Sequence, residues 1–247
     1  MEHFGYIEEN LGLIRDKIDK ASLNRDNIYN KGKPRLLAVT KTVDVEKINY
    51  AISKGIDLIG ENKVNELLEK YDKLDKDGLE IHFIGTLQTN KVKYIIDKVN
   101  LIQSVNSIRL AEEINKRAAQ KNIKMDVLIE LNIGEEDSKT GINPDETFEF
   151  INALKDFENL RVKGLMTIPP PLFSLENNEN LKKTGEKSEI AKFFIKIYEI
   201  FVDISAKKID NIDMRFLSMG MSDDFEEAIK YGSNIVRIGR AVFGKRF

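Results

Sequence analysis

The chain has 247 residues, of which 41% are hydrophobic and 32% are charged, and its formal net charge is −2. A length of about 250 residues is typical of one (β/α)₈ barrel, so we expect residues 1–247 to form a single domain. The weak net charge excludes a global field that would attract nucleic acid or a membrane surface. The chain contains no cysteine, which excludes disulfides, thiolate metal sites and a cysteine nucleophile.

The first residues, Met-Glu-His-Phe, include an acidic side chain and no apolar core, so we do not expect a signal peptide. No stretch reaches the roughly 18 apolar residues that a membrane-spanning helix needs. We therefore expect a cytoplasmic protein.

The first predicted element is a helix near the N-terminus. Ile7, Leu11, Ile14 and Ile18 follow one another at helical spacings, which places them on one face. A polar stretch that ends in Lys31–Pro34 separates this helix from the rest of the chain.

Eight short apolar runs come next, and residues with a helical pattern follow each of them. The runs are continuous rather than alternating, as expected for parallel strands buried on both faces. They are Arg35–Thr40, Asp57–Gly60, Ile81–Gly85, Leu101–Val105, Asp126–Leu131, Val162–Ile168, Phe216–Met219 and Ile235–Gly239. Eight strand-then-helix units predict an α/β fold, a (β/α)₈ TIM barrel with an extra N-terminal helix. An open doubly wound sheet is the alternative.

Two of the intervening helices carry clear signals. Residues Glu189–Ala206 place their large apolar side chains on one stripe. Another helix is predicted to begin at Asn143, with Pro144 in its first turn and Glu146 completing a capping box. The polar stretch Pro169–Ser188 is predicted to be a loop on the functional face, either a solvated connection or a lid.

Active groups of such barrels lie where the strands end. Lys41 directly follows the apolar run Leu36–Val39. A lysine drawn toward a desolvated interior has a lowered pKa and becomes a nucleophile for aldehydes. The alternative is a structural lysine whose ammonium group reaches solvent at the strand end.

The seventh and eighth runs end in a second cluster. It comprises Ser218, Met219, Gly220, Ser222, Gly239 and Arg240. The loops after strands seven and eight often bind phosphate, because helix N-terminal amides point there. Ser222 would cap a helix over Asp223–Lys230, and Arg240 would open the last helix. Plain turn chemistry is the alternative interpretation of these serines and glycines.

Arg237 lies inside the last apolar run, so an inward side chain needs a buried partner. A carboxylate or a ring nitrogen of a ligand would serve. Arginine keeps its proton in proteins, so a pyridine nitrogen that accepts from it stays unprotonated. The ring is then a weaker electron sink than a ring paired with aspartate.

The two histidines give little support for catalysis or metal binding. We expect His82, inside an apolar run, to be a hydrogen-bonded core residue rather than a base. His3 lies in a terminal segment and carries no signal. Two distant histidines without a carboxylate motif do not indicate a metal site.

Several blocks, in order over nearly the whole chain, match one known family. They are Leu37–Thr42, Gly60–Asn62 with Val64 and Glu66, His82–Gly85 with Leu87–Gln88 and Asn90–Lys91, Asn132–Ile133, Ser138–Lys139 with Gly141, Gly164–Met166 with Ile168–Pro169, Leu217–Asp224, and Val236–Gly239 with Phe243–Gly244 and Arg246. In these blocks the chain resembles the pyridoxal phosphate homeostasis protein family (YggS/PROSC type).

The resemblance implies a barrel like the N-terminal domain of alanine racemase, with pyridoxal 5′-phosphate (PLP) bound covalently. It implies that Lys41 forms the Schiff base, that Arg237 faces the pyridine nitrogen, and that Asn62 lies near the ring. It also implies that the phosphate lies near Ser218, Met219, Gly220, Ser222, Gly239 and Arg240.

Two residues depart from the family pattern. Lys63 stands where the family usually has an aromatic residue, which puts the packing beside Asn62 in doubt. Thr40 replaces a common serine before the lysine and keeps the hydroxyl.

Family members are taken to buffer or deliver PLP and to influence amino-acid and keto-acid pools, without an established reaction. We therefore expect a PLP carrier, a monomer or weak dimer, with apo PLP-dependent enzymes as candidate recipients. The alternative is a PLP-dependent amino-acid racemase. A racemase of the alanine racemase type takes a second base from a further β-domain, which the residues up to Phe247 do not supply.

Overall fold

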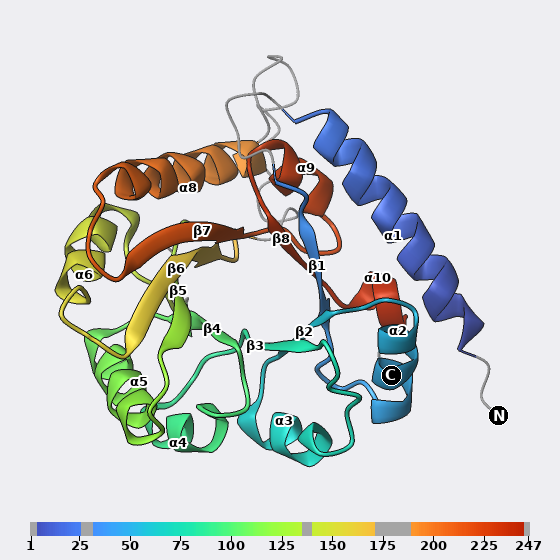
Figure 1. Ribbon diagram of the computed structural model, residues 1–247. Coiled ribbons are helices and arrows are strands. Elements are labelled where there is room, and N and C mark those ends of the chain that lie inside the picture. Colours follow the sequence, from blue (N-terminus) through green and yellow to red (C-terminus); the bar gives the residue numbers. More distant parts are fainter. Residues whose placement is uncertain (1–3, 26–31, 135–139, 171–188, 245–247) are drawn as a thin grey trace.

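The eight predicted apolar runs form eight parallel strands that pair in chain order, and the last strand returns to the first (Figure 1). This arrangement comes from a computed structural model, which describes residues 4–25, 32–134, 140–170 and 189–244. The strands are β1 (Arg35–Val39), β2 (Leu58–Glu61), β3 (Glu80–Phe83), β4 (Leu101–Val105), β5 (Met125–Leu131), β6 (Leu160–Thr167), β7 (Ile212–Ser218) and β8 (Ile235–Ile238). Leu37 of β1 pairs with Arg237 of β8, so the sheet closes into a barrel. The closed barrel is confirmed over the open sheet.

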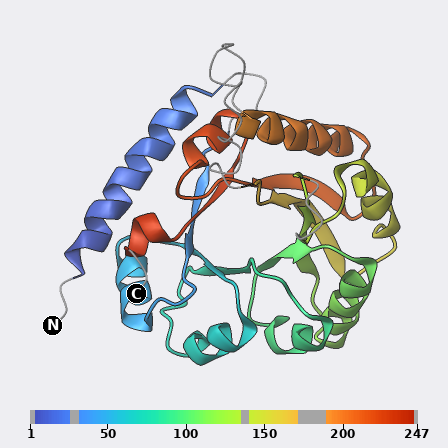
Figure 2. The same cartoon turned by 180° about the vertical axis from the view of Figure 1, so that it is seen from behind.

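Helices surround this barrel, as the view from behind also shows (Figure 2). They are α1 (Gly5–Leu23), α2 (Val45–Ser53), α3 (Val64–Tyr71), α4 (Val92–Ile95), α5 (Ile108–Gln120), α6 (Thr147–Ala153), α8 (Glu189–Ala206), α9 (Phe225–Lys230) and α10 (Arg240–Phe243), with the 3₁₀ turns η1 (Thr89–Lys91) and η2 (Pro144–Glu146). In the part of the chain that the structure describes, no helix is both long and apolar enough to cross a membrane.

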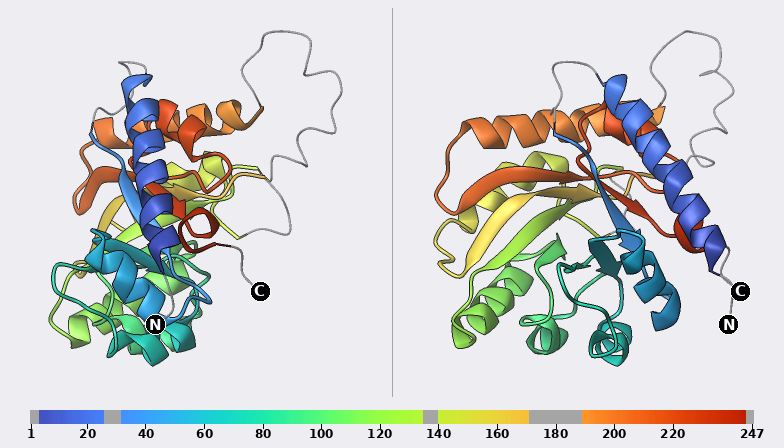
Figure 3. Two further views of the ribbon diagram at one scale, coloured as in Figure 1. Left: turned by 90° about the vertical axis from the view of Figure 1, so that its right-hand side faces the viewer. Right: turned by 45° about the vertical axis from the view of Figure 1, so that its right-hand side comes forward.

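The N-terminal helix α1 packs outside the barrel against α9 and α10, the last helix, which is only four residues long. Its predicted apolar face is confirmed, because Ile7, Leu11, Ile14 and Ile18 are all buried. The Tyr6 hydroxyl donates to the carbonyl of Phe243 at 3.3 Å, and the Asn10 amide donates to the carbonyl of Val242 at 3.1 Å. Helix α1 therefore lies along α9 and α10 on the outside of the barrel (Figure 3).

Side chains on β1 alternate between the two sides of the barrel wall. Ala38 belongs to the large apolar cluster between the strands and the helices. Leu37 and Val39 instead contact Ile84 of the β3 end and Ile235 of β8, strands that do not neighbour each other. Such contacts form only inside a barrel, so Leu37 and Val39 point inward. The alternation of a strand, continued beyond its end, directs Lys41 to the inner side at the C-terminal mouth.

Two predicted helix starts differ in detail from the structure. At Asn143 the side chain accepts from the amide of Asp145 at 3.0 Å and Pro144 lies in the first turn, as predicted. That turn is 3₁₀ rather than α-helical, since the Glu146 amide donates to the Asn143 carbonyl three residues earlier.

The prediction that Ser222 caps a helix over residues 223–230 is wrong. Helix α9 begins at Phe225, and Asp224 occupies the capping position. The Asp224 carboxylate accepts from the amide of Met221, so it stabilises the turn that precedes the helix. Of the predicted loop at 169–188, residues 171–188 lie outside the described part of the chain.

Gly164 of β6 marks the tightest approach between two strands. Its φ is +145°, and a Cβ atom there would lie 1.8 Å from the carbonyl oxygen of Phe216 on β7. The register between β6 and β7 shifts at this point. A glycine is therefore required for the two backbones to pair.

We expect Gly164→Ala to lower the free energy of unfolding by about 3 kcal/mol, because Cβ overlaps backbone atoms that cannot move aside. Gly12→Ala is the matched control, since a Cβ at this exposed α1 position meets nothing within 4 Å. That change should raise the free energy by about 0.5–1 kcal/mol through helix propensity. Urea unfolding of both variants measures the difference, and equal effects would contradict the crowding at Gly164.

Candidate functional site

The residues predicted to form the site come from four neighbouring strands, β7, β8, β1 and β2. Lys41 follows β1, Asn62 follows β2, Ser218 ends β7 and Arg237 lies in β8. Since the strands are parallel, their C-terminal ends share one mouth of the barrel. The fold thus brings together residues that are almost 200 positions apart in the chain.

Lys41 is half-buried and lies between two residues whose conformations are tightly constrained. Thr40 is fully buried, and its hydroxyl lies 2.6 Å from Oε1 of Glu61 and 3.2 Å from the carbonyl of Gly60. Thr42 has a φ of +59°, in the left-handed region that β-branched residues rarely adopt. The Thr40 hydroxyl, which the family's usual serine would also provide, forms hydrogen bonds in this structure.

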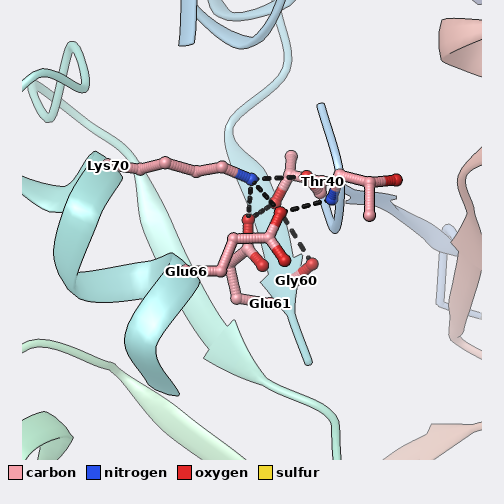
Figure 4. A network of polar contacts seen from close by, with 6 residues as sticks. Thr40, Gly60, Glu61, Glu66 and Lys70 are labelled. Carbon is pink, nitrogen blue, oxygen red and sulfur yellow. Dashed lines mark hydrogen bonds and ion pairs between the residues drawn. The ribbon is translucent and has the colours of Figure 1, made fainter. Parts of the chain in front are cut away.

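A buried lysine on α3 ties these two neighbours together (Figure 4). Lys70 Nζ donates to the carbonyl of Thr40 at 2.8 Å, to Glu61 Oε1 at 2.9 Å and to Glu66 Oε1 at 2.6 Å. Glu66 Oε1 also accepts from the backbone amide of Thr42. Burial raises the pKa of Glu61, and the contacts with Thr40 and Lys70 oppose this shift. Lys70 was not predicted from the sequence; its spacing of four residues from Glu66 on one helix was the available signal.

Asn62 offers an acceptor that needs a partner. Its Oδ1 is buried and has no hydrogen-bond partner in the part of the chain that the structure describes. Buried polar atoms are nearly always paired, so a ligand with a donor group fits here. A hollow of about 350 Å³ adjoins Asn62, and Lys63 and Lys91 line it. These cations at the rim favour an anionic ligand.

Arg237 is a buried cation inside the barrel, only 4% exposed. One of its terminal nitrogens donates to Ser218 Oγ at 2.7 Å, and the other donates to the carbonyl of Thr167 at 2.7 Å. Burial lowers the pKa of Arg237 to about 10, while the carboxylates of Asp224 and Glu130 oppose the shift. Arg237 therefore remains charged at neutral pH. A guanidinium has five N–H groups, so these two bonds leave donors for a ligand.

Behind Arg237 a line of hydrogen bonds crosses the barrel interior. The Ser218 hydroxyl accepts from Arg237, so its own proton goes to Gln103 Oε1 at 2.7 Å. The Gln103 amide then donates to His82 Nδ1 at 2.9 Å. His82 Nε2 faces Glu80 Oε2 at 3.5 Å. Each donor in this line points away from the mouth. Because Nδ1 of His82 accepts from the Gln103 amide, His82 is neutral and carries its proton on Nε2.

The line ends at the opposite face of the barrel, where Arg35 donates to Glu80 at 2.9 Å. The hydrogen bond from His82 and the charge of Arg35 lower the pKa of Glu80 to about 2. The interpretation of His82 as a hydrogen-bonded core residue is confirmed. Gln103 was not predicted as a functional residue from the sequence. The available signal was a polar residue inside the apolar run Leu101–Val105.

The structure separates the predicted phosphate cluster into two groups. Ser218 is fully buried, and its hydroxyl accepts from Arg237 and donates to Gln103. Ser218 therefore affects the site by holding Arg237 in place. Met219 is also fully buried. Gly220 has a φ of +92°, and a Cβ there would lie 2.6 Å from the Cβ of Ala228, so it permits close packing of α9.

The second group lies nearer the surface. Ser222 is half-buried in the turn before α9. Gly239 precedes α10, and Arg240 opens it, as predicted. Arg240 is exposed and pairs with Asp223 at 2.8 Å. The assignment of a phosphate to Ser222, Gly239 and Arg240 stays a prediction.

The neutral His82 makes stability depend on pH. Burial lowers the pKa of His82 below 6.5, while the unfolded chain takes up the proton near 6.5. Below 6.5 the unfolded state holds more protons, so the free energy of unfolding falls as pH falls, by at most about 1.4 kcal/mol per unit. His82→Asn keeps an acceptor near Nδ1 and cannot titrate. Urea unfolding at about pH 7.5 and pH 5.5 should show a steeper loss for the wild type; parallel losses would mean that His82 is not held neutral.

Known proteins share this architecture. The family model described as "Alanine racemase, N-terminal domain" matches residues 18–246. A crystal structure of an unknown protein from Bifidobacterium adolescentis superposes with a TM-score of 0.84 at 31% identity, covering 97% of this chain and 95% of that one. PipY of Synechococcus elongatus, in a structure with PLP bound, superposes with a TM-score of 0.77 at 24% identity, covering 96% and 100%. The likeness to PipY concerns the fold.

The sequence comparison is more specific. The pyridoxal phosphate homeostasis protein of Aquifex aeolicus is 42% identical over 238 residues, which cover 96% of this chain and 97% of the relative. Identity at this level over nearly the full length of both chains shows common descent. The chain belongs to the pyridoxal phosphate homeostasis protein family.

Proposed function

We propose that the protein carries PLP as a Schiff base on Lys41 and acts in PLP homeostasis, buffering the cofactor and delivering it. The observation that carries this proposal is the placement of Lys41 and Arg237 at the ends of two paired strands. Strand alternation directs the Lys41 amine to the inner side of the mouth, and Arg237 is a buried, charged donor. The name of the Aquifex relative and the PLP in PipY support the choice of cofactor.

The residues present suit this cofactor chemically. PLP supplies an aldehyde carbon that a neutral amine attacks. Lys41 Nζ would form the C=N bond, and the aldehyde oxygen would leave as water. Arg237 would donate to the ring nitrogen, and the unpartnered Oδ1 of Asn62 would accept a hydrogen bond near the ring. Ser222, Gly239 and Arg240 would hold the phosphate at the β7 and β8 loops.

A carrier suits these groups better than a racemase. An arginine at the ring nitrogen leaves that nitrogen unprotonated and weakens the ring as an electron sink. The chain also spans 97% of a relative named as a homeostasis protein. We propose apo PLP-dependent enzymes as recipients of the cofactor. The cytoplasmic location, the single domain and the monomer or weak dimer stay predictions.

Trapping tests the covalent link. PLP added to the protein should produce an imine absorbance in the visible range, and borohydride should convert the link to a stable adduct on Lys41. Mass spectrometry maps the modified lysine. Lys41→Ala should lose the adduct, whereas the control Lys124→Ala, at an exposed position before β5, should keep it. Label spread over surface lysines would refute the Schiff base on Lys41.

The phosphate assignment is tested by a pair of ligands. Ser222→Ala combined with Arg240→Ala should weaken PLP binding about 10- to 100-fold, as expected when charged hydrogen bonds are lost. Pyridoxal, which lacks the phosphate, should bind the double variant and the wild type equally. Circular dichroism checks that the fold is intact. Unchanged PLP affinity would move the phosphate site elsewhere in the mouth.

A further inference from the structure

We propose that Lys70 is a positioning residue for Lys41. It would act through a cluster that we call the Lys70 clamp, made of Thr40, Glu61, Glu66, Lys70 and the backbone amide of Thr42. This inference rests on the proposed function, because it assigns a role toward the amine that would bind PLP. No residue of the clamp need touch the cofactor.

The clamp joins the ends of β1 and β2 to helix α3, on the helix side of the barrel wall (Figure 4). Ala38 faces the helices and Val39 faces the interior, so Thr40 faces the helices again. Thr40 meets Glu61 and Lys70 there, both less than 10% exposed. The alternation of β1, continued beyond Val39, directs Lys41 to the opposite side of the wall. The clamp therefore acts on Lys41 through the backbone.

The clamp holds the chain on both sides of Lys41. Before it, Lys70 binds the carbonyl of Thr40, and Glu61 accepts from the Thr40 hydroxyl. After it, Glu66 accepts from the amide of Thr42. The left-handed conformation of Thr42 costs of order 1–3 kcal/mol. Glu66 opposes that cost, so the turn that aims Lys41 depends on the clamp.

Lys70 is the centre of the clamp. Its ammonium group has three N–H donors, and the three contacts at 2.8, 2.9 and 2.6 Å use all of them. Glu61 and Glu66 both bind this one cation. Without Lys70, the buried carboxylate of Glu61 and the partly buried carboxylate of Glu66 would repel each other at close range. Glu66 would then move away and release the amide of Thr42.

A second buried lysine that forms an ion pair gives a matched control. Lys163 of β6 donates to Asp213 of β7 at 2.8 Å, and its side chain is 11% exposed against 10% for Lys70. Lys163→Met removes a buried lysine of similar exposure from a strand on another side of the barrel. It should destabilise the protein without changing the turn at Lys41.

The experiment compares Lys70→Met with Lys163→Met in the full chain. The rate constant for imine formation with PLP, followed by stopped-flow absorbance, should fall about tenfold or more in Lys70→Met, because the amine is misplaced. It should stay within about twofold in Lys163→Met, where no reacting group moves. A second readout needs no PLP: acetic anhydride labelling of Lys41, relative to exposed Lys124, should change only in Lys70→Met. Equal rates and equal labelling in both variants would overturn the positioning role.

Two substitutions at Glu66 test the same role with less risk to folding. Glu66→Gln keeps an oxygen that accepts from Thr42 and Lys70. Its rate constant for imine formation should therefore stay within about threefold of the wild-type value, because loss of the charge weakens these hydrogen bonds only modestly. Glu66→Ala removes the acceptor and should resemble Lys70→Met. Equal loss in both Glu66 variants would overturn positioning through the Thr42 amide. If the wild-type protein formed no adduct on Lys41, the proposed function would fail. If the wild type formed the adduct and Lys70→Met formed it at the same rate, only the positioning role of Lys70 would be refuted.

Discussion

A positive charge buried inside the barrel, on Arg237, is the constraint around which the interior is arranged. An unpaired buried ion is costly, so such a group needs hydrogen-bond partners and opposing charge. Ser218, Thr167 and the fields of Glu130 and Asp224 provide them. Ser218 can accept from Arg237 because Gln103 takes its proton. The barrel therefore holds a cation at its mouth by means of polar residues that run through its core.

The two sides of one strand end have different tasks. At the end of β1, strand alternation directs Lys41 toward the mouth, whereas Thr40 lies against Glu61 and Lys70 on the helix side. Helix α1 covers the wall of β8 and β1, where α10 is too short to do so. The hydrogen-bonded groups around Lys41 thus lie on the helix side of the wall, and the mouth is left for a ligand. This division suits the carrier role proposed above.

Much of the fold could be predicted from the sequence, because its signals are local. Continuous apolar runs predicted all eight strands, with ends shifted by a few residues, and helical spacing predicted α1 and the bounds of α8. Lys41, Asn62 and Arg237 could be proposed as site residues because strand ends of a barrel share one mouth and because the surrounding blocks match a family. These inferences need only the order of elements and the identity of nearby residues.

The sequence by itself therefore determined the barrel, the family and the residues that reach the mouth. Only the tertiary structure decided how those residues are used. Lys70 meets a carbonyl 30 positions away, and Gln103 meets a hydroxyl 115 positions away. The Ser218 hydroxyl turns toward Arg237 rather than toward the loops, and Asp224 takes the capping position expected of Ser222. Such choices depend on which polar groups closure of the barrel brings within hydrogen-bond distance, and no local pattern in the chain carries that information.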